Sequence, residues 1–298
     1  MDIRIEYVEQ EARIYLSSEH PAEFVAAVLG EAGGEIYSTP AILSPGSLFW
    51  IQTEPSLDKI GTFAVEVRKE GKAISRKEFW QDPPTLLCDI MKKHGSDKST
   101  WHNYARTYHT LFSEMRSRKI DIFEMGLGTN NTSLASNMGA DGVPGASLRA
   151  WKEYFTLADI FGADIDRSIL FQEERIATLW CDQTDPAAIE AMWESDALRG
   201  KKMDIIIDDG LHEYHANLAF FEASISRLKP DGIFVIEDLT EETAANFAQS
   251  IGWLQEKHCC SMDVLELPYA GNHGGDNRLL IATPRHPLRS KLISIFGE

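Results

Sequence analysis

The chain has 298 residues, 43% of them hydrophobic and 25% charged, a composition typical of a globular protein that excludes a collagen-like or largely disordered chain. Its 29 lysines and arginines face 46 aspartates and glutamates, so the formal net charge is −17. That balance argues against a surface for nucleic acid or for an anionic membrane, because either requires clustered cations.

The sequence shows no pattern of a membrane anchor or an export signal. No apolar run approaches the roughly 20 residues of a membrane-spanning helix, and the start MDIRIEYVEQ lacks the basic and apolar regions of a signal peptide. The four cysteines have the spacing of neither a zinc site nor a disulfide framework. We therefore expect a cytoplasmic protein with reduced cysteines, and the sequence leaves open whether it forms a homo-oligomer.

Residues 1–85 are expected to form a small α+β domain. Short runs of β-type residues, among them IRIEYV and TFAVEVRK, are bounded by glycine, proline and serine. The segment PAEFVAAVL is predicted to be a helix with Pro21 near its first turn, where a missing N–H costs nothing. The prolines of QDPP at 81–84 end any preceding element. They mark the boundary with a second domain at 86–298.

Beyond this boundary, strands and helices alternate. Helices are predicted at 85–95 and 100–119, and the strands that follow have the sequences IDIFEMG, DIFGAD, IATLW, DIIIDD and GIFVIED. Helical patterns lie between these strands, including one at 167–175, and the alternation indicates a parallel sheet covered on both faces. The last strands, MDVLEL and RLLIAT, lack a crossover helix and are expected to pair antiparallel at one edge. The fold class is therefore α/β, with a Rossmann-like sheet.

The candidate site lies where these strands end, because open parallel sheets bind ligands beyond the carboxyl ends of their strands. The first strand ends in E-x-G-x-G, whose glycines allow a tight turn and a close approach of the backbone to a ligand. The second strand ends in an acid placed to hold ribose hydroxyls, and the third in polar groups able to read an adenine edge. These features predict an adenosine-containing ligand. The candidate cofactor-binding residues are Glu124, Gly126, Gly128, Asp164, Asp182 and Gln183.

The details favour S-adenosylmethionine (SAM) over a dinucleotide. A dinucleotide fingerprint requires G-x-G-x-x-G and an acid about 20 residues further on, whereas Asn131 replaces the third glycine here and Asp164 lies well beyond that distance. Glu124 would also repel a pyrophosphate, while it suits the sulfonium and ammonium groups of SAM. A tight turn in some other α/β enzyme is the alternative interpretation.

Two further strands end in pairs of acids, Asp208 with Asp209 and Glu237 with Asp238. Adjacent parallel strands would place all four carboxylates on one rim, where they repel one another unless a cation lies among them. An all-oxygen ligand set suits Mg²⁺ or Ca²⁺ rather than zinc; the alternative is that these acids cap helices or face solvent. His212 is the candidate general base, because a neutral imidazole beside these carboxylates could take a proton from a substrate oxygen.

Several motifs, in order, resemble those of Mg²⁺-dependent sugar O-methyltransferases, a family that includes mycinamicin-type macrolide-sugar enzymes and methyltransferases of polysaccharide gene clusters. The motifs are GSDK with the HNY that follows it, EMGLG, PGASLRAWKEYF, FGADID, CDQTD, DIIIDDGLH and VIEDL. The resemblance covers about residues 92–240. It implies a class I methyltransferase fold, SAM and Mg²⁺ as cofactors, and methyl transfer to a hydroxyl of a sugar or another small polyol.

The resemblance also implies roles for single residues. In that family the acid of the D-G-x-H motif and the E-D pair bind the metal, and the motif histidine is the general base. The corresponding residues here are Asp209, Glu237 and Asp238 as metal ligands and His212 as the base. The family's SAM contacts correspond to candidate cofactor residues named above. Leu211 departs from the small polar residue usual in this motif, which leaves the acceptor unidentified.

Two further residues of these motifs and one segment that follows the EMGLG motif concern the candidate site. Lys98 and Asp208 are additional candidate cofactor contacts; Lys98 comes before the first strand and either closes over the cofactor or lies on a packing helix. The Asn/Gly-rich segment 129–145 is longer than most loops of compact domains. It is expected to fold over SAM, to line the acceptor pocket, or to extend into solvent.

The resulting hypothesis is transfer of the SAM methyl group to a hydroxyl of a sugar held by Mg²⁺. A catechol O-methyltransferase is the nearest alternative, although such enzymes usually place Asn beside the last acidic ligand and use Lys as base. A non-catalytic SAM-binding regulatory or scaffold protein would keep Gly126 and Asp164 without needing the acidic rim. A nucleotide-dependent oxidoreductase would instead bind NAD.

Overall fold

The structure is a computed structural model, and it describes most of the chain. The described residues are 2–8, 11–17, 22–29, 35–43, 48–53, 62–80, 84–267 and 275–285. Among them, none of the helices combines the length and the apolar character that crossing a bilayer requires.

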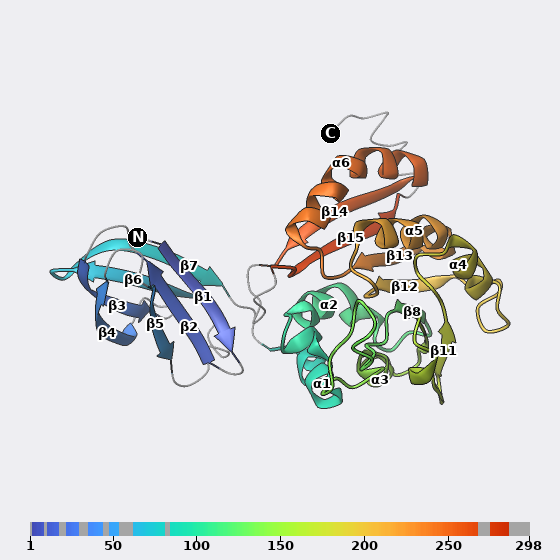
Figure 1. The fold of residues 1–298 in the computed structure, drawn as a ribbon, viewed down its shortest axis with the longest axis horizontal. Coiled ribbons are helices and arrows are strands. Elements are labelled where there is room, and N and C mark those ends of the chain that lie inside the picture. Colours follow the sequence, from blue (N-terminus) through green and yellow to red (C-terminus); the bar gives the residue numbers. More distant parts are fainter. Residues whose placement is uncertain are drawn as a thin grey trace.

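The described residues between 2 and 80 form strands, which make up two antiparallel sheets with the orders β1-β2-β5 and β4-β3-β6-β7 (Figure 1). The strands are β1 (Asp2–Val8), β2 (Glu11–Ser17), β3 (Ala22–Leu29), β4 (Glu35–Leu43), β5 (Leu48–Thr53), β6 (Thr62–Lys69) and β7 (Lys72–Trp80).

The helix predicted from PAEFVAAVL is wrong, because its described part is strand β3, which pairs with both β4 and β6. Glu23 and Val25 are exposed, while Phe24 and Ala26 are buried. The alternation over these four residues has the period of two expected of a strand, and further along the strand Ala27 and Leu29 are buried as well. Pairing on both sides therefore overrides the helical propensity of the alanines, and the described N-terminal residues are all-β rather than α+β.

The larger part of the chain is built on one eight-stranded sheet with the order β10-β11-β9-β8-β12-β13-β15-β14. The strands from β11 to β13 are parallel, while β15 is antiparallel to both β13 and β14, which confirms the expected antiparallel edge. The strands are β8 (Asp121–Met125), β9 (Asp159–Asp164), β10 (Gln172–Glu173), β11 (Ile176–Trp180), β12 (Met203–Asp208), β13 (Leu228–Ile236), β14 (Cys260–Glu266) and β15 (Arg278–Pro284).

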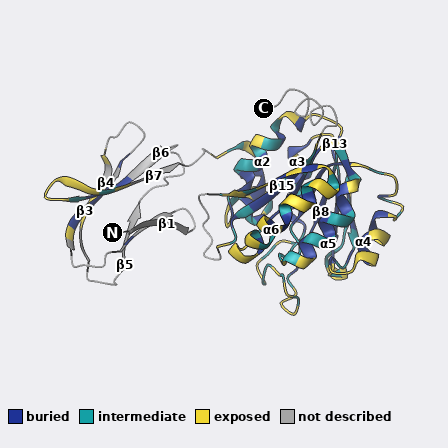
Figure 2. Cartoon of the chain, turned by 90° about the horizontal axis from the view of Figure 1, so that it is seen from above, coloured by how far each residue is buried: buried dark blue, intermediate teal, exposed yellow. Residues whose placement is uncertain are grey.

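Helices cover both faces of this sheet. The helices are α1 (Leu86–His94), α2 (Tyr104–Phe112), α3 (Ala146–Tyr154), α4 (Pro186–Trp193), α5 (Tyr214–Ser224) and α6 (Glu241–His258). Side chains of α1–α3 pack with Ile205 and Ile207 of β12, whereas side chains of α4–α6 pack with Ile206 on the other face. Figure 2 shows the result, with exposed outer faces on the helices and buried strands between them. The predicted three-layer α/β arrangement is confirmed.

Two further element predictions differ from the structure. The helix predicted at 167–175 is a 3-10 turn, Arg167–Ile169, followed by β10, which folds back onto β11. Arg175 has a left-handed φ of 62°, and a tight reversal of this kind leaves no room for a helix. The helix predicted at 100–119 is shorter, because only Tyr104–Phe112 is α-helical, and 3-10 turns lie on either side of it.

The strand order reverses between β8 and β12, since the chain continues from β8 to β9 on one side and returns to β12 on the other. The carboxyl ends of these strands are therefore the expected ligand site. The backbone N–H of Asp209 donates to the carbonyl of Met125 at 2.8 Å. Gly126 has a φ of +92°, and a Cβ there would lie 1.8 Å from the carbonyl oxygen of Asp209. Only glycine fits this close approach between the two strand ends.

Candidate active site

A pocket of about 860 Å³ opens at the carboxyl ends of the parallel strands. Its wall includes Gly126 and Gly128 from the turn after β8 and Asp164 from the end of β9. The same wall contains Asp209, His212 and Asp238 from the turns after β12 and β13. The structure thus brings the predicted cofactor turn and part of the predicted acidic rim into one cavity.

Backbone hydrogen bonds fix the acid at the cofactor end of the pocket. The carboxylate of Asp164 accepts hydrogen bonds from the backbone N–H groups of Leu127 and Asp166, both at 2.8 Å. Burial raises the pKa of Asp164, and these N–H donors oppose that shift. Ile165 follows with 46% of its surface exposed and lies in the pocket wall. An acid beside an exposed apolar side chain suits a ribose hydroxyl pair next to a flat aromatic base.

Asp182 and Gln183 also line the pocket, at the end of β11. Gln183 connects two strand ends, since its Oε1 accepts from the N–H of Leu211 at 2.9 Å and its Nε2 donates to Asp208 Oδ1 at 2.7 Å. A second donor, Asn217 Nδ2, lies 3.0 Å from Asp208 Oδ2. Asp208 is fully buried, which raises its pKa to about 6 against the effect of these donors. It therefore connects protein groups and is not among the residues of the pocket wall.

The Asn/Gly-rich segment 129–145 folds over the glycine turn. Its own side chains hold it: Asn130 Nδ2 donates to the carbonyls of Gly139 and Gly142 at 2.6 and 2.9 Å. Met138 lies so close to Gly128 that a Cβ there would be 2.2 Å from its sulfur. Residues 133–138 belong to the pocket wall. Of the alternatives left open by the sequence, the structure supports a segment that lines the pocket.

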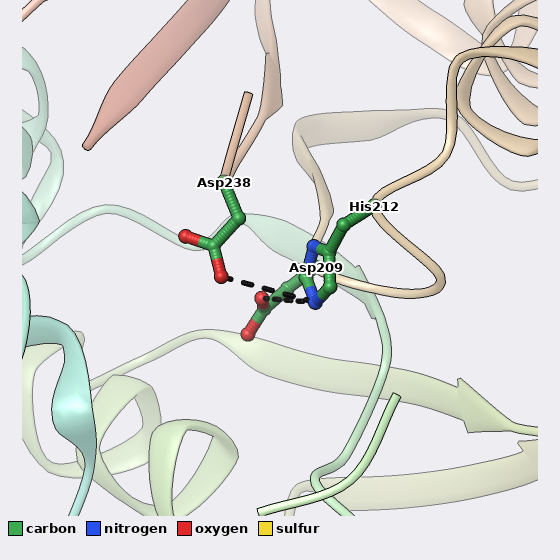
Figure 3. Close-up of side chains that lie close together, drawn as sticks. All are labelled: Asp209, His212 and Asp238. Carbon is green, nitrogen blue, oxygen red and sulfur yellow. Dashed lines mark ion pairs between the residues drawn. The ribbon is translucent and has the colours of Figure 1, made fainter. Parts of the chain in front are cut away.

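Asp209, His212 and Asp238 converge on one point of the pocket wall (Figure 3). The Nε2 atom of His212 lies 4.0 Å from Asp209 Oδ1 and 3.8 Å from Asp238 Oδ2. One ligand atom from each of the three residues lies within 4.8 Å of the others. This spacing and the two carboxylate oxygens fit a divalent cation that prefers oxygen ligands.

The backbone at this point is unusual, because both His212 and Asp238 have left-handed conformations, with φ of 63° and 56°. Non-glycine residues adopt this region uncommonly, and aspartate and histidine tolerate it better than most. Such conformations persist where the surrounding structure imposes them, and they concentrate at functional sites. In addition, His212 Nδ1 is buried without a hydrogen-bond partner among the described residues.

The buried ammonium group of Lys98 contacts the Asp209–His212–Asp238 cluster through Asp209. Lys98, 1% exposed, donates from Nζ to Asp209 Oδ2 at 2.5 Å and to Glu237 Oε2 at 2.6 Å. Glu124 Oε1 lies 3.5 Å from the same nitrogen. Burial alone would lower the pKa of Lys98, but the charges of Asp209, Glu237 and Glu124 outweigh it and raise this pKa well above its usual range. Lys98 therefore lies as a cation in an acidic cluster.

Two predicted ligand-binding residues belong to this buried cluster and not to the pocket wall. Both oxygens of Glu237 are occupied, Oε2 by Lys98 and Oε1 by the hydroxyl of Tyr108 at 2.5 Å. Both oxygens of Glu124 accept hydrogen bonds as well, from Ser147 and Trp151. Successive side chains at a strand end point to opposite sides, which is why neighbouring acids of the sequence do not share one rim.

Tyr104 is part of the HNY motif, but neither Tyr104 nor Tyr108 was predicted from the sequence as a partner of these acids. Tyr104 donates to Asp238 Oδ1 at 2.7 Å, and Tyr108 donates to Glu237. Their spacing of one helical turn places both hydroxyls on one face of α2, and that spacing is the signal that was available. His102 lies beside them, with Nε2 3.4 Å from Asp238 Oδ1.

Comparison with protein families and curated proteins gives sequence relatives of one kind. No family model matches the chain. It is 35% identical over 153 residues to the 8-demethyl-8-alpha-L-rhamnosyl tetracenomycin-C 2'-O-methyltransferase of Streptomyces olivaceus, covering 51% of this chain and 37% of that protein. It is 27% identical over 215 residues to the mycinamicin VI 2''-O-methyltransferase of Micromonospora griseorubida, covering 71% of this chain and 50% of that protein. The chain thus spans half or less of the length of these curated relatives.

Solved structures agree with this resemblance at the level of the fold. The MycE methyltransferase from the mycinamycin biosynthetic pathway, in complex with Mg, SAH and mycinamycin VI, superimposes with a TM-score of 0.53 at 17% sequence identity. The alignment covers 90% of this chain and 85% of that one. Crystal form 1 of MycE with Mg and SAH gives a TM-score of 0.52 at 17% sequence identity. The chain therefore has the class I methyltransferase fold, and its sequence relatives are sugar O-methyltransferases of natural-product pathways.

Proposed function

We propose that this chain is a SAM-dependent O-methyltransferase that uses a divalent cation, Mg²⁺ in the first place, to methylate a hydroxyl of a sugar in a natural product or surface polysaccharide. The proposal is supported by sequence relatives that are O-methyltransferases of tetracenomycin and mycinamicin pathways. It is carried by one observation, which is that the glycine turn, Asp164 and the Asp209–His212–Asp238 cluster share a single pocket.

In this proposal SAM occupies the part of the pocket between the glycine turn and the end of β9. Asp164 would receive the ribose hydroxyls, and Ile165 would contact the adenine ring, with Asp182 and Gln183 near its polar edge. Gly126 and Gly128 allow the backbone to approach the methionine part of the ligand.

The cation would be held from the pocket side by Asp209 and Asp238, whose Oδ1 and Oδ2 atoms face His212. Glu237 as a third ligand remains a prediction, and it requires that Glu237 exchange its bond with Lys98 for one with the ion. A site with few protein carboxylates leaves positions for water or for acceptor oxygens, as is usual for Mg²⁺.

When bound, SAM supplies the methyl group and the cation supplies positive charge that lowers the pKa of a nearby hydroxyl. His212 Nε2 would take the proton of the acceptor hydroxyl as that oxygen displaces the sulfur from the methyl carbon. The adjacent carboxylates of Asp209 and Asp238 would stabilise the imidazolium that results. Asp209 and Asp238 thus serve both the cation and the base.

The acceptor would lie beside Trp101, which forms part of the pocket wall with 50% of its surface exposed. Trp101 directly precedes His102, which contacts Asp238. An exposed indole offers an apolar face to the C–H groups of a pyranose ring, while the adjacent hydroxyls of the ring point to the cation. This arrangement favours a sugar over an acceptor that lacks such a face.

We also propose that residues 1–85 form an auxiliary domain and residues 86–298 the methyltransferase domain, in a cytoplasmic protein. The division is supported by sheet topology, because the described strands before residue 81 pair among themselves and not with the eight-stranded sheet. The acidic net charge gives no reason to expect a nucleic-acid partner.

The decisive experiment is incubation of the full chain with SAM, Mg²⁺ and a panel of glycosides and nucleotide sugars, followed by mass spectrometry for the gain of one CH₂ group. We expect methylation that EDTA abolishes and that the variant Asp209→Asn lacks, although this variant still binds SAH. Binding of SAH without methylation of any polyol would instead support a non-catalytic SAM-binding protein. Methylation that persists in EDTA would remove the cation from the proposal.

A further inference from the structure

Helix α2 presents two tyrosine hydroxyls to two successive acids. The buried residues of this helix include Tyr104, Tyr108 and Phe112, which recur every four positions and so lie on one face. Tyr108 bonds to Glu237 and Tyr104 to Asp238, the pair that follows β13. The helix therefore contacts the acid pair in register, one hydroxyl for each carboxylate.

The contacts of Tyr104 fix one oxygen of Asp238 and leave the other available. Its hydroxyl donates to Asp238 Oδ1 at 2.7 Å and lies 3.3 Å from the backbone N–H of the same residue, which can donate to it. His102 approaches the same Oδ1 at 3.4 Å. The other oxygen, Oδ2, is the one that faces His212. The protein thus holds Asp238 by one carboxylate oxygen and directs the second into the pocket.

Tyr104 is itself held in place. Its ring stacks on His102 at 4.5 Å between centroids with an interplanar angle of 13°. It lies fully buried in the core beneath the sheet. Its single proton can also reach the carbonyl of Asp276 at 3.1 Å, but the shorter bond goes to Asp238. A rigid donor of this kind can maintain the left-handed backbone of Asp238, whose φ is 56°.

We propose that Tyr104 is a positioning residue of the cation site, which fixes Asp238 so that Oδ2 points at the ion. This inference rests on the proposed function, since it assumes that Asp238 is a ligand. Groups that orient the ligands of a metal are often worth about 10–100-fold in metal affinity. Loss of the Tyr104 hydroxyl should therefore weaken cation binding much more than it weakens the fold.

The test compares two variants that each lose one buried tyrosine hydroxyl. Tyr104→Phe keeps the ring in the core and removes the bond to Asp238. Tyr154→Phe is the matched control, because Tyr154 is equally buried and its hydroxyl lies 2.8 Å from His109 Nδ1, outside the cation site. The probe is Mn²⁺ alone, whose free concentration is measured by electron paramagnetic resonance, with Mg²⁺ as competitor. SAH affinity and melting temperature are recorded for each protein.

We expect Tyr104→Phe to bind Mn²⁺ about 10–100-fold more weakly and to alter the resonance of the bound ion, while Tyr154→Phe binds it like the wild type. Both variants should retain their affinity for SAH. Equal Mn²⁺ affinity of Tyr104→Phe and the wild type would overturn the inference and leave the proposed function intact. An equal loss in both variants would overturn it too, since the effect would then be a general one on stability. A wild-type protein that binds neither Mn²⁺ nor Mg²⁺ would overturn the cation site itself.

Discussion

The buried ammonium of Lys98 gives a quantitative test of the acidic cluster. The substitution Lys98→Met keeps a long apolar side chain and removes the charge that neutralises Asp209, Glu237 and Glu124. Removing one partner of a buried ion pair costs about 3–5 kcal/mol, because the remaining charge has no compensation. For a unit of 150–250 residues each kcal/mol lowers the melting temperature by about 2–4 °C, so a decrease of roughly 6–20 °C is expected.

The assay is thermal and urea unfolding in EDTA, so that no divalent ion replaces the lost charge. Lys119→Met is the matched control: Lys119 is paired with Asp159 at 2.7 Å, but its side chain is two-thirds exposed. Exposed ion pairs are worth about 1 kcal/mol or less. A loss of stability for Lys98→Met that is no larger than for Lys119→Met would refute the view that Lys98 neutralises a buried cluster.

The deficit of Lys98→Met should grow with pH. Burial raises the pKa of Glu237 well above its usual range, and Lys98 opposes that shift. Without the ammonium the pKa of folded Glu237 rises further, so the folded variant keeps a proton that the unfolded chain releases above its ordinary glutamate pKa. Folding then becomes less favourable as the pH rises from that value toward the folded pKa. The wild type shares this loss up to its own folded Glu237 pKa, so the deficit of the variant grows as the pH rises from that pKa toward the higher folded pKa of the variant. A deficit that shrinks as the pH rises would contradict this reasoning.

Three further substitutions test the rest of the site. Gly126→Ala should lower both stability and SAH affinity, because its Cβ would lie 1.8 Å from the carbonyl oxygen of Asp209. Gly200→Ala is the control for backbone strain alone, since Gly200 also has a positive φ but a Cβ there would meet nothing within 4 Å. Equal losses of stability in the two variants would contradict the steric argument. His212→Ala should lower kcat about 10²–10⁴-fold with SAH affinity retained, and an unchanged kcat in the presence of the acceptor would exclude it as the base. Trp101→Ala should raise the acceptor KM several-fold at nearly constant kcat, and an unchanged KM would place the acceptor elsewhere.

The alternating pattern of the sequence was sufficient to predict the parallel sheet and its antiparallel edge, because hydrophobic strands and helices of the expected length recur there. It was insufficient for β3, whose alanines and valines suit a helix as well as a strand. Pairing on both sides decides that case, and it cannot be read from a local segment. The same limit explains why the turn at 167–175 was predicted as a helix.

In the candidate site, strand-end position predicted which acids come close together but not which of them face the pocket. Asp209 and Asp238 lie in its wall, whereas Asp208 and Glu237 are bonded beneath it. The difference depends on the direction of each side chain and on partners that are distant in the sequence. Lys98 was expected near the cofactor, yet its partners are acids 111 and 139 positions away along the chain.

The helices that precede β8 determine where the chain can be truncated. Lys98, Tyr104 and Tyr108 all come before β8 in the sequence. Each of them bonds to an acid that follows β12 or β13. A fragment beginning at β8 would keep the glycine turn and every acidic strand end, yet its carboxylates would lose the ammonium and both hydroxyls. Truncations intended to isolate a working catalytic unit should therefore start no later than α1.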